Sequence, residues 1–247
     1  MLFLEKIGIL FEDFENMKTK IIFFIGPPGS GKGTQAEILS GKFGFYHLET
    51  SKILESKIMD AKKGECIQIE GKTYFFDKER EKWKNGLILS PPFVAYLIKE
   101  KVRELAEDKR KIVFSGSPRS IYEAEELLDI LLQFYLKDEM LVFNININVE
   151  ESVKRNSKRR ICQLVRHSIL YNEETISLTK CPLDGSQLLK REGLDDPETI
   201  KKRFEEYEKQ TFPVIDFFKN QGIRIEKING SYSPVVVFEN IISILEK

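Results

Sequence analysis

The chain has 247 residues, of which 41% are hydrophobic, and its 39 basic and 39 acidic side chains cancel. A chain of this size can bury a full core as one domain with insertions or as two small domains. The neutral balance gives no support for a nucleic-acid or membrane-surface partner, and no apolar stretch approaches the roughly 20 residues that span a bilayer. Three cysteines are too few for a disulfide framework, so we expect a cytoplasmic protein.

The first 16 residues lack the basic segment and the cleavage site of a signal peptide. They fit a short amphipathic helix on the surface. They also fit a choice of start site, because Met17 stands directly before the first predicted strand. Both readings stay open.

Short apolar runs alternate with helical patterns along the rest of the chain. Strands are predicted at 18–25, 111–114, 140–148 and 222–230, and helices at 34–44, 123–135, 197–222 and 234–247. This alternation predicts an α/β fold with helices on both faces of a parallel sheet. Two stretches break the rhythm: 65–76 alternates around Gly71 as a β-hairpin does, and 161–191 is polar and weakly periodic. Such excursions often carry the moving parts of α/β enzymes.

The segment GPPGSGKG, from Gly26 to Gly33, lies between a predicted strand and a predicted helix. The amides of such a loop, the positive end of the helix and the ammonium of Lys32 together bind polyphosphate. The alternative is a Gly-Pro surface turn, and the surrounding strand, lysine and helix argue against it. Gly33 stands where a Ser or Thr usually binds Mg²⁺, and Thr34 follows it.

The segment FSGSPRS presents Arg119 just after the predicted strand 111–114. The carboxyl ends of such strands open into the crevice where α/β sheets bind ligands, so Arg119 is a candidate functional residue. Ser115 carries a hydroxyl where a phosphate-handling enzyme would usually place a carboxylate that steers a metal.

Five motifs in order resemble those of the adenylate kinases and related nucleoside monophosphate kinases. GPPGSGKGTQ resembles their phosphate loop, and SGSPRS resembles their DGFPR box. FYHLETSKIL (45–54) and NGLILS (85–90) resemble the two ends of the monophosphate-binding domain. KRNSKRR (154–160) and LLKREGLDDPETIKKRF (188–204) resemble the arginine-bearing entrance to and exit from the lid. The resemblance covers nearly the whole chain from Lys18.

The resemblance implies a P-loop core, built on a five-stranded parallel sheet flanked by helices, with two insertions. The expected parts are an N-terminal extension at 1–17, a core at 18–48, 90–157 and 196–247, a monophosphate-binding domain with the hairpin at 49–89, and a lid at 158–195. It implies reversible transfer of the γ-phosphoryl of ATP, with Mg²⁺, to a nucleoside monophosphate, AMP first, in nucleotide biosynthesis. We expect these nucleotides as partners, no nucleic acid, no membrane, and a monomer.

Site residues follow from the motif positions. The catalytic set is Lys32, Arg119, Arg155, Arg159, Arg191 and Arg203. The ATP set is Gly29, Ser30, Gly31, Lys32, Gly33, Thr34, Arg155, Arg159 and Tyr171, of which Tyr171 is one residue out of register. The monophosphate set is Thr50, Leu87, Leu89, Gly116, Arg119, Glu123, Arg191 and Arg203. Converging guanidinium groups tolerate one another where anions lie between them. The alternative is that the charged residues of these segments only cover a solvated helix surface. We accept it only for the lysines that flank these arginines, which are Lys154, Lys158, Lys190, Lys201 and Lys202.

Some residues depart from the family pattern. Ser115 and Lys52 replace two aspartates, so we expect Mg²⁺ to be held mainly by phosphate oxygens and water unless Glu49 approaches. Glu55 replaces an arginine, and Glu123 replaces the glutamine that reads adenine. An ionised carboxylate only accepts hydrogen bonds and suits the N–H donors of guanine, although Glu123 could also face solvent. A kinase for GMP or another monophosphate, or a regulatory nucleotide-binding module, therefore remain alternatives.

Many members of the resembled family carry a structural zinc in the lid. Here Cys162, Cys181 and Asp184 keep the ligand spacing, Val165 fills the second position, and His167 follows two residues later. Sulfur, imidazole and carboxylate form an acceptable tetrahedral set, so we expect zinc on Cys162, His167, Cys181 and Asp184. The alternative is a lid held by hydrogen bonds among those groups. Cys66, in the hairpin, is expected to be packed and not a ligand.

Overall fold

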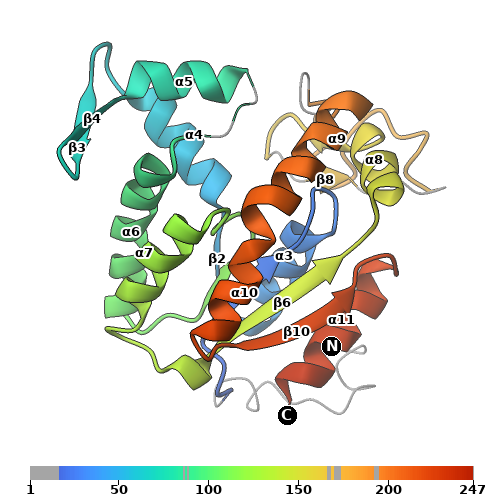
Figure 1. The fold of residues 1–247 in the computed structure, drawn as a ribbon. Helices are drawn as coiled ribbons and strands as arrows, with labels where there is room; N and C mark the ends of the chain where they lie inside the picture. The colour runs from blue at the N-terminus through green and yellow to red at the C-terminus, as the bar shows by residue number, and fades with distance from the viewer. Residues whose placement is uncertain are drawn as a thin grey trace.

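The computed structural model describes residues 17–85, 87, 89–165, 168–169, 174–191 and 195–246. Figure 1 shows a central sheet with helices on both faces and smaller elements at one end. The strands are β1 (Ile21–Ile25), β2 (Tyr46–Leu48), β3 (Cys66–Ile69), β4 (Lys72–Phe75), β5 (Ile112–Phe114), β6 (Met140–Asn146), β7 (Arg160–Cys162), β8 (Ser168–Ile169), β9 (Leu188–Leu189) and β10 (Arg224–Asn229). The helices are α3 (Lys32–Phe43), α4 (Thr50–Asp60), α5 (Phe76–Lys84), α6 (Pro91–Glu107), α7 (Ile121–Leu131), the short η1 (Lys137–Glu139), α8 (Val149–Ser157), α9 (Pro197–Glu206), the π-helix η2 (Tyr207–Thr211), α10 (Pro213–Asn220) and α11 (Pro234–Leu245).

Five strands form the central sheet in the order β10-β6-β1-β5-β2, and all pairs are parallel. The predicted α/β fold with a five-stranded parallel sheet is therefore confirmed. Four strands coincide with the predicted apolar runs, although each is shorter than its run, and Ser115 lies one residue beyond β5. The fifth strand, β2, has only three residues, too few for a periodic pattern to be recognised.

Strand β1 reads IIFFI and is buried along its whole length because both faces of the sheet are covered. Ile21, Phe23 and Ile25 belong to the core beneath α6, α7 and α10, whereas Ile22 and Phe24 belong to the core beneath α3 and α11. Because β1 packs into both cores, the end of β1 from which the phosphate loop leaves the sheet is held in place.

The predicted helix at 197–222 is interrupted. It consists of α9, the π-helical turn η2 and α10. Pro213 has no N–H to donate inside a helix, and the N–H of Phe212 bonds the carbonyl of Tyr207 at 2.8 Å, five residues back. Helix α6 had not been predicted.

The β-hairpin is confirmed, with β3 antiparallel to β4 and a two-residue turn at Glu70 and Gly71, both with positive φ. The expectation for Cys66 is wrong, because this thiol is exposed. In β3 the alternate residue Ile67 packs on the core, and the period of two turns Cys66 outward.

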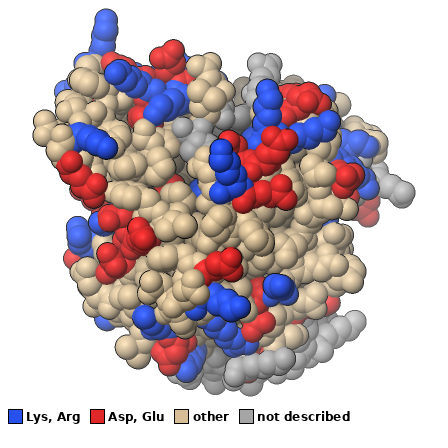
Figure 2. All heavy atoms as spheres, in the orientation of Figure 1, with Lys and Arg blue, Asp and Glu red and all other residues tan. Residues whose placement is uncertain are grey.

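Within the described ranges, no helix combines the length and apolarity needed to cross a membrane. On the face drawn in Figure 2, basic and acidic side chains are interspersed. That face therefore offers no large field of one sign.

Candidate active site

The phosphate loop runs from the end of β1 to the start of α3. Gly29 and Gly31 have φ of 76° and 95°, a conformation that favours glycine. At Gly26 a side chain has no room, since a Cβ there would lie 2.2 Å from the carbonyl oxygen of Ile145. The Nζ of Lys32 donates to the carbonyls of Gly26 and Pro27 at 2.7 and 2.8 Å. The loop is thus a rigid backbone cradle with one ammonium at its centre.

Two side chains of helix α8 form hydrogen bonds to backbone carbonyls of the phosphate loop. The hydroxyl of Ser152 donates to the carbonyl of Pro28 at 2.7 Å, and the guanidinium of Arg155 donates to the carbonyl of Gly29 at 3.3 Å. Arg155 is also ion-paired to Glu151, its neighbour one turn back, at 2.7 Å. The helix therefore holds the loop and brings Arg155 to its rim.

The electrostatics of the site show that cations converge on the loop. Burial of the ammonium lowers the pKa of Lys32 to about 7, with further lowering by Arg119, Arg203 and Arg159. Burial likewise lowers the pKa of Arg203 to about 10, with contributions from Arg119, Arg191 and Arg159. Like charges lower one another's pKa only when they are close, so Lys32, Arg119, Arg159, Arg191 and Arg203 form one cationic cluster. Such a cluster is suited to a polyphosphate.

Two arginines of the cluster are held by named partners. The Nε of Arg119 donates to the carbonyl of Gly116 at 2.7 Å, which orients the guanidinium beside β5. Arg159 is ion-paired to the buried Asp195 at 2.5 Å. The carboxylate of Asp195 fixes the guanidinium plane, so Arg159 is preorganised toward the cluster.

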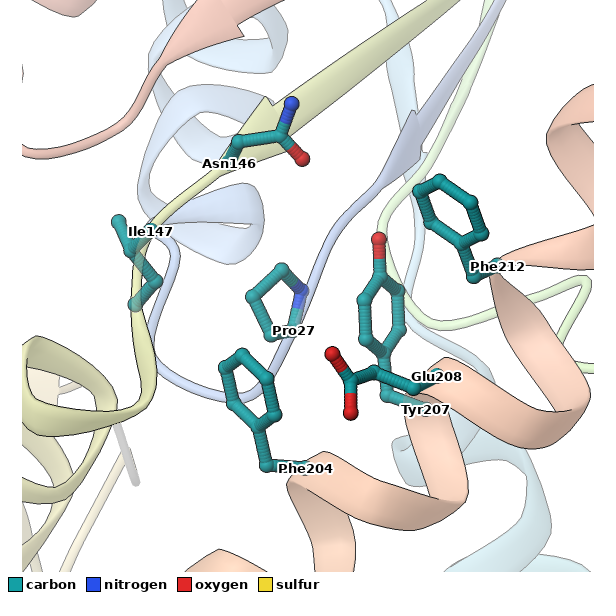
Figure 3. Close-up of a pocket in the computed structure, with 7 residues that line it drawn as sticks. All are labelled: Pro27, Asn146, Ile147, Phe204, Tyr207, Glu208 and Phe212. Carbon is teal, nitrogen blue, oxygen red and sulfur yellow. The ribbon is translucent and has the colours of Figure 1, made fainter.

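A cavity of about 350 Å³ lies beside the phosphate loop and is lined by Pro27, Asn146, Ile147, Phe204, Tyr207, Glu208 and Phe212. Figure 3 shows Pro27 of the loop facing Phe204, the residue after Arg203, with Tyr207 and Glu208 alongside. Tyr207 is buried, and its hydroxyl has no hydrogen-bond partner within the part of the chain that the structure describes. Burial, and then Glu208, raise the pKa of Tyr207 to about 12, so its hydroxyl stays protonated at neutral pH.

The predicted monophosphate site includes residues that depart from the pattern of the resembled family. Glu123 is only 4% exposed, so the alternative of a solvent-facing acid is wrong. Its Oε2 accepts from the hydroxyl of Ser117 at 2.8 Å and from the backbone N–H of Arg119 at 2.9 Å. Burial raises the pKa of Glu123, while these two donors and the charge of Arg119 oppose the rise. Thr50 is also buried here and lies against Gly116.

Ser115 is joined to His47 across the neighbouring strands β5 and β2. Its Oγ lies 2.6 Å from Nε2 of His47, and the other ring nitrogen lies 3.7 Å from a carboxylate oxygen of Glu49. Glu49 is in turn ion-paired to Lys52 at 2.6 Å. Ser115, Glu49 and Lys52, three positions that depart from the family pattern, therefore share one network with His47.

The other predicted site residues are more scattered. Ser30 is buried within the loop, and Gly33 and Thr34 lie in the first turn of α3. Leu89 is buried, whereas Leu87 is 61% exposed. Tyr171 lies outside the described residues, so its place near ATP stays a prediction.

The lid brings three of the four predicted metal ligands together. The ligand atoms of Cys162, Cys181 and Asp184 all lie within 4.8 Å of one another, and both thiols are buried. The N–H of Leu183 approaches the sulfur of Cys181 at 3.4 Å. Val165 is exposed, and His167 lies outside the described residues.

The motifs and the geometry agree with comparisons to known proteins. A family model described as adenylate kinase matches residues 24–223. The chain belongs to the adenylate kinase family. It is 36% identical over 228 residues to an adenylate kinase of Chloroherpeton thalassium, covering 92% of this chain and 97% of that protein. It is 33% identical over 212 residues to an adenylate kinase of Caldicellulosiruptor saccharolyticus, covering 84% and 90%. For an adenylate kinase of Clostridium botulinum, strain Langeland, the identity is 33% over 227 residues, covering 91% and 97%.

Sequence reasoning missed three residues of this adenylate kinase family site. Asp195 lies in the same motif as Arg191 and Arg203, so the sequence could have indicated it as an ion-pair partner for an arginine. His47 and Ser117 gave no such signal, because each acts through a partner on another element.

Proposed function

We propose that the protein transfers the γ-phosphoryl group of ATP, with Mg²⁺, reversibly to AMP and so forms two ADP. Membership of the adenylate kinase family makes the protein an ATP-dependent nucleoside monophosphate kinase, a phosphotransferase. The observation that carries the proposal is the cluster of Lys32 with Arg119, Arg159, Arg191 and Arg203 around the phosphate loop. A single phosphate would not need that many cations, whereas a triphosphate meeting a monophosphate end to end would.

The chain's own residues supply positioning and charge. The amides of the loop and Lys32 hold the outer phosphates of ATP, with Arg155 and Arg159 on the same side. Arg119, Arg191 and Arg203 hold the phosphate of the acceptor in line with the transferred group. Phosphoryl transfer needs little covalent chemistry from the protein, so alignment and neutralisation of the equatorial oxygens carry the reaction. Closure of the lid would exclude the water that would otherwise hydrolyse ATP.

Mg²⁺ accompanies ATP in this family and would neutralise the phosphate oxygens. Ser115 and Lys52 stand at the two positions of the family's aspartates, and Glu49 is ion-paired to Lys52. Phosphate oxygens and water are the ligands that Mg²⁺ prefers, so the metal would enter with ATP and take few protein ligands.

The relatives are named adenylate kinases, which supports AMP as the acceptor. The carboxylate of Glu123 would also suit GMP. The buried carboxylate presents acceptors only when it is ionised, which fits the two N–H donors on guanine. The raised pKa of Glu123 increases the share of the neutral acid, which can donate as well as accept, as adenine requires. We therefore place AMP first.

A transfer assay with ATP and each of AMP, GMP, CMP, UMP and dTMP tests this proposal. AMP should give the fastest formation of diphosphate, and Arg119→Ala should reduce it about a thousandfold or more. Lys202→Ala, an exposed lysine beside Arg203, is the matched control and should keep the activity. Binding of ATP without turnover of any monophosphate would make the protein a regulatory module instead.

For the lid we propose a structural zinc on Cys162, Cys181 and Asp184, with His167 as the fourth ligand. Two buried thiols and a carboxylate within 4.8 Å fit this metal, and the backbone N–H of Leu183 would orient the thiolate of Cys181. The purified protein should contain one equivalent of zinc, and Cys181→Ser should lose it together with several degrees of melting temperature. Cys66→Ser, the exposed thiol in the hairpin, should change neither. Metal-free wild-type protein with an unchanged melting temperature would favour the hydrogen-bonded lid.

A further inference from the structure

Ser115 lies at the edge of the sheet where the phosphates bind. Strand β5 pairs with β1 on one side and β2 on the other, and the phosphate loop leaves the sheet directly after β1. Helix α3 packs against β2 and β5 and begins with Lys32 at this same edge. The next residue along from Ser115, Gly116, lies against the guanidinium of Arg119. Ser115 therefore lies at the edge of the sheet that carries both the phosphate loop and the loop of Arg119.

The register of the sheet places His47 and Ser115 on one face. His47 is level with Val113, and side chains two residues apart on a strand share a face. Their contact is short, 2.6 Å between Nε2 of His47 and Oγ of Ser115. The side chain of Glu49, also two residues on, reaches to within 3.7 Å of Nδ1 of His47. Serine, histidine and carboxylate therefore form a chain that ends at the phosphate edge.

This arrangement makes His47 a base. Burial, and then the charge of Lys52, lower the pKa of His47, and only Glu49 opposes them, so the ring is neutral near pH 7. A carboxylate beside Nδ1 favours the tautomer that carries its proton there, which leaves Nε2 to accept the hydroxyl proton of Ser115. A surface cavity of about 450 Å³ is lined by His47, Glu49, Lys52 and Arg110, so the ring can pass a proton on to solvent.

We propose that Ser115 is a site of self-phosphorylation. When ATP is bound without a monophosphate, Oγ of Ser115 attacks the γ-phosphorus. The new Oγ–P bond forms as the bond between the γ-phosphorus and the β,γ-bridging oxygen breaks, the hydroxyl proton passes to Nε2 of His47, and ADP leaves with the bond's electron pair. The inference rests on the proposed function, which supplies ATP at this site.

The product would change the charge of the site. Phosphoserine carries between one and two negative charges at neutral pH and three acceptor oxygens. It would place an anion where the rest of the family has the aspartate of its DGFPR box. The modified protein would then hold the water shell of Mg²⁺ from the protein side, which the unmodified hydroxyl does weakly.

Incubation of the full chain with ATP and Mg²⁺, without any monophosphate, tests the inference by intact mass and peptide mapping. The mass should rise by one phosphate group, located on Ser115 and formed together with ADP. Ser115→Ala should take up none, and Ser56→Ala, an exposed serine on α4 whose hydroxyl bonds Asp60, should still be labelled on Ser115. His47→Asn should slow the labelling about a hundredfold, the usual contribution of a general base.

The outcomes separate this inference from the proposed function. Transfer from ATP to AMP with no phosphate on Ser115 overturns the inference alone. Neither transfer nor labelling overturns both. Labelling of Ser115 at an unchanged rate in folded His47→Asn protein rules out the histidine relay. A second readout is the rate of transfer to AMP: phosphorylated protein and Ser115→Asp should both exceed Ser115→Ala, and equal rates would remove the functional consequence.

Discussion

The two sides that we propose for the active site, one for ATP and one for the acceptor, are built in different ways. The ATP side is a backbone cradle, in which Gly26, Gly29 and Gly31 give the path and Lys32 gives the charge. The acceptor side is a network of side chains in which Ser117 bonds Glu123 and Ser115 bonds His47. Backbone geometry tolerates few substitutions, whereas a side-chain network can be exchanged as a set. Most of the departures from the family pattern lie on the proposed acceptor side.

The strongest way to break the ATP side is to add one methyl group at Gly26. In Gly26→Ala the new Cβ would lie 2.2 Å from the carbonyl oxygen of Ile145 and 2.7 Å from the hydroxyl of Ser30. Relief requires the loop backbone to move, so we expect about 1–3 kcal/mol of lost stability by chemical denaturation. Transfer should fall about a hundredfold or more, since the cradle would be displaced.

Gly41→Ala is the matched control, because its Cβ would meet nothing within 4 Å in the last turn of α3. Alanine should stabilise this helix by roughly 0.5–1 kcal/mol and leave transfer unchanged. Equal stability of the Gly26 and Gly41 variants would show that the loop is less rigid than its packing indicates.

A second prediction uses the proton of Lys32. Its pKa of about 7 means that the amine is mostly neutral at pH 8 in the free protein. Bound phosphates favour the charged form and raise that pKa, so ATP binding at pH 8 should take up about one proton. Calorimetry in buffers of different ionisation enthalpy measures this uptake.

Lys32→Met should remove the proton uptake, and Lys202→Met, an exposed lysine on α9, should keep it. Because the pKa rises on binding, the sign must be uptake, and the amount should shrink as the pH falls below 7. Proton release at pH 8 would contradict the desolvated state of Lys32.

The smallest expected effect lies on the acceptor side at Glu123. Glu123→Gln replaces an acceptor-only group by an amide with both a donor and an acceptor, while its oxygen can still take the bonds from Ser117 and Arg119. One hydrogen bond contributes about 1 kcal/mol, so kcat/KM should rise about fivefold for AMP and fall by a similar factor for GMP.

Glu125→Gln, an exposed acid on the same helix, is the matched control and should change neither ratio. An unchanged AMP-to-GMP ratio in Glu123→Gln would mean that the base does not contact this side chain.

Much of the fold was within reach of the sequence because its signals are local. The phosphate loop lies within eight consecutive residues, and alternation of polar and apolar residues around one glycine predicts the hairpin. Short β2 and the π-turn before Pro213 were not predicted, since three residues carry no period and a π-turn depends on how the helix packs. Cys66 was misassigned because alternation fixes that successive residues face opposite ways, and only the packed hairpin decides which way is outward.

For the site, the sequence by itself determined the chemistry of individual residues. It identified a polyphosphate cradle at Lys32, arginines at motif positions and three zinc-type ligands at their spacing, because each of these depends on residues close along the chain. The tertiary structure alone decided the partnerships. Ser115 and His47 are 68 residues apart and meet because β5 and β2 are neighbours in the sheet. The sequence showed only that Ser115 replaces an aspartate. That Ser115 lies beside His47 depends on the order of the strands in the sheet and not on the spacing of residues along the chain.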